Sequence, residues 1–140
     1  MKKKYYKGLK LNDFEKEIFG LKKSKEYKKL NKKLGRNEPM YWNFDSSFFV
    51  QLYADLNAFI DSSERACVDM TYHKFTDTKG VERTEIEMIE HIKSLIIELH
   101  ETEFDYGKTY DLIIEEHNRE KELIKDILMN LAIVMPSLWN

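Results

Sequence analysis

The sequence has few residues that end helices and almost none that cross-link a chain. Its 140 residues include five Gly, two Pro and one Cys, Cys67. The scarcity of Gly and Pro argues against an all-β fold with many turns and favours long helices. A single cysteine excludes an internal disulfide framework, which is typical of a reducing compartment. We therefore expect a mainly α protein of the cytoplasm.

Long hydrophobic runs are missing as well. No stretch of about 18 apolar residues occurs, so the sequence predicts no membrane-spanning helix and no membrane partner. The basic start, MKKKYYKG, is not followed by the apolar stretch of a secretory signal.

Spacings typical of metal sites and of nucleophilic catalysis are also absent. The histidines, His73, His91, His100 and His117, are scattered, and no zinc-ligand spacing includes them or Cys67. No pair of a nucleophile and a base can be argued from spacing. We therefore expect no catalytic residue, no metal and no cofactor.

One enzymatic alternative stays open. Helical nucleotide pyrophosphatases hold magnesium with Glu-x-x-Glu on one helix and Glu-x-x-Asp on another. This chain has Glu87-x-x-Glu90, but Glu122 and Asp126 are one residue too far apart and are expected to face solvent. A magnesium-dependent hydrolase would require these carboxylates to converge.

Apolar residues recur at helical spacing through most of the chain. They predict long amphipathic helices over residues 45–66, 84–102 and 109–134, and a shorter basic helix over residues 24–34. Asp45, Ser46 or Ser47 can cap the first long helix, and Thr84 with Glu87 forms a capping box before the second. The fold class is therefore mainly α, a small helical bundle.

The last long helix has a predicted core stripe with His117 at the centre of its arc. The apolar members of this stripe are Tyr110, Ile113, Ile124, Ile127, Leu128, Leu131 and Met135. We interpret His117 as a polar residue inside the core, satisfied by hydrogen bonds, or as a break in the helix.

Residues 68–83 have a different pattern. Val68, Met70 and Tyr72 alternate with polar residues, as in a strand that is buried on one face. Turn residues follow at Lys79 and Gly80, and residues 81–83 could form the return strand. The sequence allows either a short β-hairpin or an irregular loop here.

Charge is divided very unequally along the chain. Residues 1–36 contain fourteen Lys and Arg and four Asp and Glu. The rest of the chain contains nine Lys and Arg and twenty-one Asp and Glu, and the net charge of the whole chain is −2. We therefore divide the chain into a basic N-terminal arm and amphipathic helix, residues 1–38, and an acidic helical bundle domain, residues 39–140. Residues 1–10 are expected to form a flexible arm.

The basic segment is the main candidate site for nucleic acid or a nucleoprotein. Its lysines can neutralise phosphates, and the tyrosines among them can stack on bases. The candidate residues are Lys2, Lys3, Lys4, Lys7, Lys22, Lys25, Lys28, Lys29, Lys32, Lys33 and Arg36. Two alternatives remain: the segment binds an acidic protein, or it is solvated or packs on the acidic body of its own chain or of a second copy in a homodimer.

An acidic face is the second candidate surface. Glu87, Glu90, Glu98 and Glu101 share one side of the predicted helix over residues 84–102. They could imitate phosphates and face a basic partner, or they could be an ordinary solvated helix face.

Three short motifs add a resemblance. They are Tyr41-Trp42-Asn43-Phe44-Asp45, Tyr72-His73-Lys74-Phe75 and Met135-Pro136-Ser137-Leu138-Trp139. With these motifs, residues 40–140 resemble small uncharacterised accessory proteins of phages of low-GC Gram-positive bacteria. The resemblance implies a mobile-element protein that acts in the host cytoplasm on host machinery or phage DNA. A non-catalytic accessory or anti-defence role is the function we expect.

Overall fold

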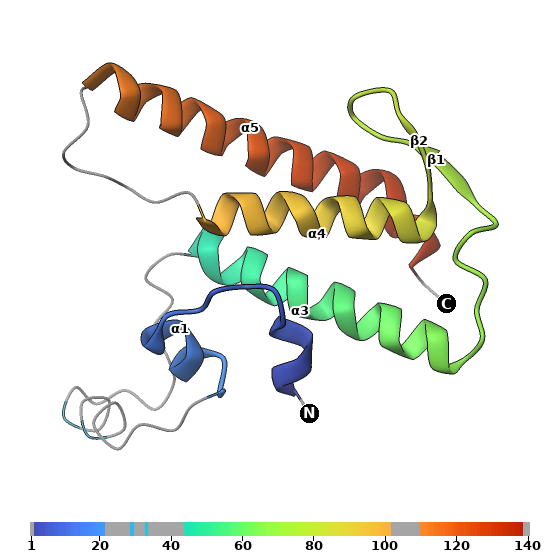
Figure 1. The fold of residues 1–140 in the computed structure, drawn as a ribbon, viewed down its shortest axis with the longest axis horizontal. Helices are drawn as coiled ribbons and strands as arrows, with labels where there is room; N and C mark the ends of the chain where they lie inside the picture. Colours follow the sequence, from blue (N-terminus) through green and yellow to red (C-terminus); the bar gives the residue numbers. More distant parts are fainter. Residues whose placement is uncertain (1, 22–28, 30–32, 34–43, 102–109, 139–140) are drawn as a thin grey trace.

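The computed structural model describes residues 2–21, 29, 33, 44–101 and 110–138 (Figure 1). It is mainly helical, with a small antiparallel hairpin, and so confirms the predicted fold class. Its elements are η1 (Lys2–Tyr6), α1 (Asp13–Ile18), α3 (Phe44–Arg65), β1 (Lys74–Thr76), β2 (Glu82–Thr84), α4 (Glu85–Glu101), α5 (Tyr110–Val134) and η2 (Met135–Ser137). None of the helices described here is long and apolar enough to cross a membrane.

Two helices begin at capping boxes. The Thr84 N–H donates to Glu87 Oε1 at 3.0 Å and the Glu87 N–H donates to Thr84 Oγ1 at 3.3 Å, which confirms the predicted start of α4. Asn12 and Glu15 make the same reciprocal pair before α1, at 3.1 and 2.8 Å. These bonds satisfy backbone donors that the first turn of a helix leaves free.

Helix α4 lies between α3 and α5 (Figure 1). Its side chains Met88, Ile89 and Ile92 are 0% exposed, because both neighbours pack against it. The buried cluster around them consists of Phe49, Tyr53, Leu56, Met88, Ile89, Ile92, Ile96, Ile127, Leu131 and Val134. The hydrophobic core therefore follows the length of α4.

The predicted stripe of α5 is wrong along one edge. Leu128 and Met135 are 43% and 47% exposed, while Leu123 and Asn130, which were left out of the stripe, are 0% exposed. The reason is that α5 packs mainly on α4. The side of α5 that α4 covers is narrower than the apolar stripe and is rotated towards Leu123. His117 lies outside the covered arc, exposed, within a helix that continues past it, so its predicted place in the core is also wrong.

The hairpin exists, but its first strand is not where the alternation placed it. Lys74 pairs with Thr84, Phe75 with Arg83 and Thr76 with Glu82. Residues 68–73 instead form turns, in which Val68 and Tyr72 are exposed. An alternating pattern predicts a strand only where a second strand can pair with it, and residues 82–84 pair with residues 74–76.

Residues 2–21 pack against α3, so the prediction of a flexible arm over residues 1–10 is wrong. Tyr6 is 7% exposed and forms a small second cluster with Val50 and Ala54 of α3. The Tyr53 hydroxyl donates to the Lys7 carbonyl, and Asn57 Nδ2 donates to the Tyr5 carbonyl at 2.7 Å. The predicted boundary at residues 38 and 39 lies outside the described residues, as does most of the predicted basic helix over residues 24–34.

The approach of Gly8 to α3 generates a prediction. Gly8 has φ +102°, and a Cβ there would lie 2.5 Å from the Tyr53 hydroxyl oxygen. We expect Gly8→Ala to lower the free energy of unfolding by about 1–3 kcal/mol, measured by urea denaturation. Gly20→Ala is the control, because Gly20 also has a positive φ, +71°, but has no atom near its Cβ position. An equal loss in both variants would contradict close packing of residue 8 on Tyr53.

Candidate functional site

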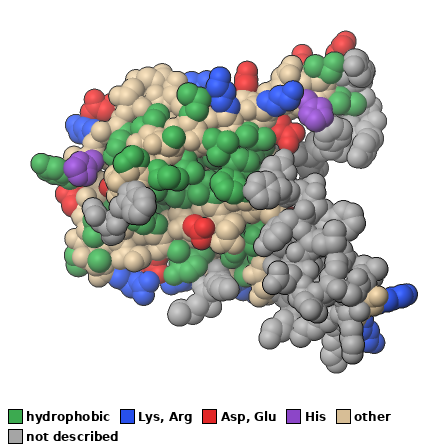
Figure 2. All heavy atoms as spheres, turned by 180° about the vertical axis from the view of Figure 1, so that it is seen from behind, with side chains coloured by type: hydrophobic (Ala, Val, Ile, Leu, Met, Phe, Trp, Pro, Cys, Tyr) green, Lys and Arg blue, Asp and Glu red, His purple; other side chains and the backbone are tan. Residues whose placement is uncertain are grey.

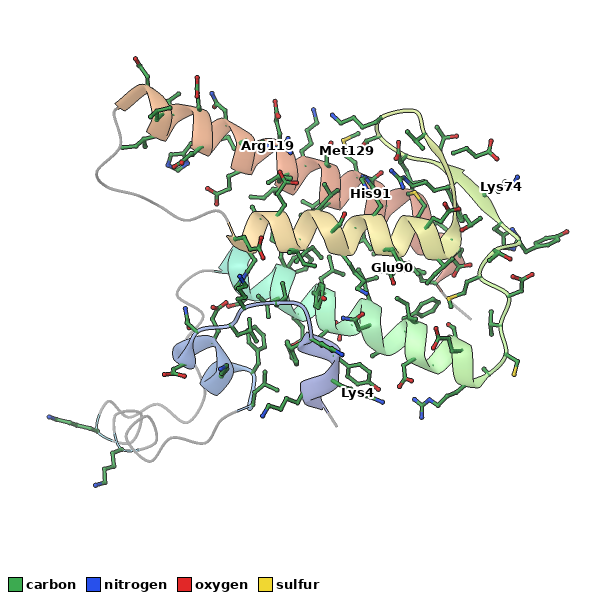
Figure 3. The ribbon with its side chains drawn as sticks, viewed as in Figure 1. Lys4, Lys74, Glu90, His91, Arg119 and Met129 are labelled. Carbon is green, nitrogen blue, oxygen red and sulfur yellow. The ribbon has the colours of Figure 1, made fainter. Side chains whose placement is uncertain are left out.

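One predicted lysine of the basic segment is an attachment point. Lys4 Nζ lies 3.1 Å from Asp61 Oδ2 of α3, and the Tyr5 hydroxyl donates to the same oxygen at 2.9 Å (Figure 3). The hydrogen bonds from Tyr5 and Lys4 hold the pKa of Asp61 below its usual value, and the bond to Asp61 raises the pKa of Lys4. Both side chains are therefore charged at neutral pH, and Lys4 forms an ion pair within its own chain.

A second contact attaches the segment to α4. Glu15 of α1 lies 2.9 Å from Nε2 of His100, near the end of α4. Both side chains are largely buried, so the contact is shielded from solvent. The start of the basic segment is thus held at two separate points.

Five other described lysines of the segment are exposed to solvent. They are Lys3, Lys7, Lys10, Lys29 and Lys33. In the part of the chain that the structure describes, no ion pair engages any of the five. Five predicted site residues, Lys22, Lys25, Lys28, Lys32 and Arg36, lie outside the described residues, and the side chain of Lys2 is not described either.

The predicted acidic face is exposed but partly occupied. Glu87 binds Thr84 in the capping box, Glu90 pairs with Lys93 at 3.2 Å, and Glu98 pairs with Arg119 of α5 at 2.7 Å. Figure 3 shows Glu90 and Arg119 apart, on different helices. Glu101 completes the face and is exposed. Because two of the four carboxylates, Glu90 and Glu98, pair with cations of the chain, the face presents less free charge than its sequence indicates.

The carboxylates of the hydrolase alternative do not converge. Glu122 lies 3.7 Å from Arg119 and Asp126 lies 3.8 Å from Lys79. Glu87 and Glu90 have the partners given above. Among the described residues, no group of three or more His, Cys, Asp or Glu side chains could hold a metal ion.

A buried carboxylate organises the hairpin. The Asp77 side chain is 1% exposed and accepts from Arg83 Nε at 2.7 Å. It also accepts from the backbone N–H groups of Lys79 and Val81, at 2.8 and 2.9 Å. These bonds lower the pKa of Asp77 to about 2, and the bond from Arg83 has the largest effect. The turn between β1 and β2 is therefore built around a carboxylate that is charged at neutral pH.

The same hairpin also contacts α4 and α5. His91 of α4 lies 4.0 Å from Asp77, and burial, followed by the charge of Arg83, holds the pKa of His91 below its usual value. Asn130 of α5 accepts from the Thr78 N–H at 3.0 Å and donates to Thr78 Oγ1 at 3.3 Å. These contacts explain why Asn130 is fully buried. The sequence analysis missed this cluster because its members are up to 53 positions apart, between Asp77 and Asn130.

A pocket lies next to the hairpin. Its volume is about 650 Å³, and its walls come from α3, the turns after it, β1, the first residue of α4, and η2. The lining residues are Phe59, Val68, Asp69, Tyr72, His73, Lys74, Phe75, Glu85, Pro136 and Ser137. Pockets that hold small ligands have volumes of roughly 300–1,000 Å³.

The most unusual residue of this pocket is Glu85, which is 5% exposed. Burial raises the pKa of its carboxyl group, and the nearby His73 partly opposes that shift. No sequence signal identified Glu85, because acidic residues are ordinary in the first turn of a helix. Its burial depends on the position of residues 68–75, which the sequence analysis placed incorrectly.

Comparison with known proteins adds no relative. No protein-family model, curated protein or solved structure matches this chain significantly.

The Asp77 cluster predicts a specific dependence of stability on pH. The folded-state pKa of Asp77, about 2, lies below the ordinary value of 3.8. Its stabilising effect is therefore present above pH 3.8 and is lost as the pH falls towards 2. We expect Asp77→Asn to lower the free energy of unfolding at pH 7 by about 2–4 kcal/mol. The variant should also lose less stability than the wild type as the pH falls. Asp111→Asn, at an exposed position of α5, is the control. Equal acid sensitivity in wild type and Asp77→Asn, measured by urea denaturation at several pH values, would contradict the assignment.

Proposed function

We propose that the protein is a non-catalytic binding protein that engages nucleic acid, or a nucleoprotein, through its basic N-terminal segment. The observation that carries the proposal is the exposure of five lysines, Lys3, Lys7, Lys10, Lys29 and Lys33, without ion-pair partners among the described residues. An accessory or anti-defence role for a phage or other mobile element fits this proposal, because a protein that occupies a charged groove needs no catalytic group.

The attachment of residues 2–21 supports the proposal. Lys4 and Glu15 fix this segment to α3 and α4, so its other lysines start from a defined position. A ligand that binds a fixed cationic surface costs less conformational entropy than one that must order a loose tail. Lysine is a point charge without the paired geometry of arginine, so we expect phosphate contacts with little base specificity.

An electrophoretic shift assay over a series of salt concentrations tests this function. We expect Lys7→Gln/Lys10→Gln to weaken binding of a duplex or single strand roughly tenfold. The slope of log affinity against log salt should fall by about one for each phosphate contact removed. The matched control is Lys121→Gln/Lys125→Gln, which removes the same charge from exposed positions of α5.

Two results would reject nucleic acid as the ligand. One is wild-type affinity that does not change with salt. The other is an equal loss in both double variants, since that would reflect net charge and not the basic segment.

The second candidate function is self-association, and the open edge of α5 favours it. Ile114, Leu128 and Met135 are 40–47% exposed and lie on one side of the helix, beside the partly buried Ile124. Figure 2 shows hydrophobic side chains gathered in a band across the rear face of the molecule. A wide exposed apolar stripe of this kind is typical of an interface.

Light scattering after size-exclusion chromatography tests self-association. We expect Leu128→Glu to convert a dimer into a species of the chain mass, 16.8 kDa, with a small effect on folding because Leu128 is already 43% exposed. Met129→Glu is the control: Met129 is 46% exposed but lies on the side of α5 away from α4 (Figure 3). A wild-type mass of one chain at high concentration would reject the homodimer.

A further inference from the structure

The pocket beside the hairpin is separate from the basic segment and has a different charge. Its base is Glu85, at the start of α4, and Asp69 and Tyr72 stand in the turns that follow α3. Phe59 of α3 and Phe75 of β1 supply apolar wall, and Pro136 and Ser137 of η2 close another side. The pocket is therefore built from segments far apart in the sequence, which the fold brings together.

The burial of the Glu85 side chain is offset only in part, by the nearby His73. The residue is 5% exposed, and in the part of the chain that the structure describes no hydrogen bond or ion pair reaches its carboxylate. Its backbone N–H donates to the His73 carbonyl at 3.2 Å. Placing an unpaired carboxylate in an apolar site costs stability, whereas leucine there would not carry that cost. A ligand that supplies the missing positive charge would explain the arrangement.

A second carboxylate adds negative charge to the pocket. Asp69 Oδ1 accepts from the N–H of Thr71 at 2.9 Å and from its hydroxyl group, and these bonds hold the pKa of Asp69 below its usual value. The one lysine in the lining does not cancel this charge, because Lys74 Nζ lies 3.3 Å from Glu82 on the next strand. Glu85 and Asp69 therefore favour a cation over a phosphate in this pocket.

Aromatic rings complete the chemistry. Phe59 and Phe75 are partly buried in the wall, and Tyr72 is 76% exposed with its ring edge-on to His73 at 5.1 Å. Aromatic faces attract organic cations and also cover their apolar stems. Inorganic cations prefer several oxygen ligands, and the described residues offer no group of three or more candidate ligands.

We propose that this pocket binds an organic cation, a guanidinium or ammonium group on an apolar stem. The charged group lies against Glu85, and the stem lies between the aromatic walls. The same chemistry is presented by a free small amine and by an arginine or lysine side chain of a partner protein. This site does not depend on the proposed binding of nucleic acid, so either can fail without the other.

Calorimetric titration with two probes of nearly equal shape tests the proposal. Benzamidine is a cation, whereas benzamide is neutral. We expect the wild type to bind benzamidine at least tenfold more tightly than benzamide, and Glu85→Gln to lose at least tenfold in benzamidine affinity and most of the discrimination. Glu101→Gln removes the same charge from an exposed position of α4 and should bind as the wild type does.

A second variant guards against an effect on folding. Tyr72→Ala changes a side chain that is 76% exposed, so the fold should be unaffected while benzamidine affinity falls severalfold. Equal affinity for the two probes, undiminished binding by Glu85→Gln, or no binding of benzamidine at millimolar concentration would overturn the proposal.

Two further probes identify the source of the cation. Agmatine is a free guanidinium compound, and the tripeptide Gly-Arg-Gly carries the same group on a peptide. Tighter binding of agmatine supports a small-molecule ligand, and tighter binding of the tripeptide supports a side chain of a partner protein. Failure of both, with binding of benzamidine, would rule out the guanidinium group and restrict the proposal to an ammonium group.

Discussion

The burial of α4 on two sides is the constraint on which the rest of the structure depends. A helix whose side chains Met88, Ile89, Ile92 and Ile96 are all essentially unexposed needs a neighbour on each flank, and α3 and α5 are those neighbours. Removing such side chains from water is the largest favourable contribution to folding. Helices α3 and α5 are held mainly through α4, and the edge of α5 beyond it stays open to solvent. The same arrangement that closes the core therefore leaves an apolar stripe uncovered.

The N-terminal segment depends on this core in turn. With α4 against one side of α3, another side remains available to Tyr6 and to the polar contacts of Lys4 and Tyr5 with Asp61. Exposed ion pairs contribute little stability, so the apolar contacts of Tyr6 and the close approach at Gly8 supply most of the attachment. Lys3, Lys7 and Lys10 thus stay exposed, because few of the lysines of residues 2–21 are needed to hold these residues in place.

Local signals in the sequence predicted the helices well and the surfaces poorly. The capping box at Thr84 and Glu87 and the helical spacing around Ile89 depend on residues within a few positions, so the start of α4 was correct. The covered side of α5 depends on where α4 lies, so the apolar stripe gave too wide a core and placed His117 inside it. The first strand of the hairpin was predicted at the wrong residues because Asp77 fixes the position of the hairpin. The partners of Asp77 come from the turn, from β2 and from α4. Glu85 could not be identified as a pocket residue, because its burial depends on the position of residues 68–75.

Asp77 and Glu85 show how a buried carboxylate can be assigned a role. Both are nearly inaccessible, but the pKa of Asp77 falls to about 2 because Arg83 and two backbone N–H groups bind it, whereas burial raises the pKa of Glu85. A satisfied carboxylate stabilises the turn that it organises and leaves no capacity for a ligand. An unsatisfied one destabilises the fold and keeps its full capacity to accept hydrogen bonds and positive charge. Asp77 lies in the turn of the hairpin and Glu85 directly follows β2 at the start of α4, and the first fixes the strand whose position buries the second. The structural carboxylate is thus what makes a binding carboxylate possible in so small a protein.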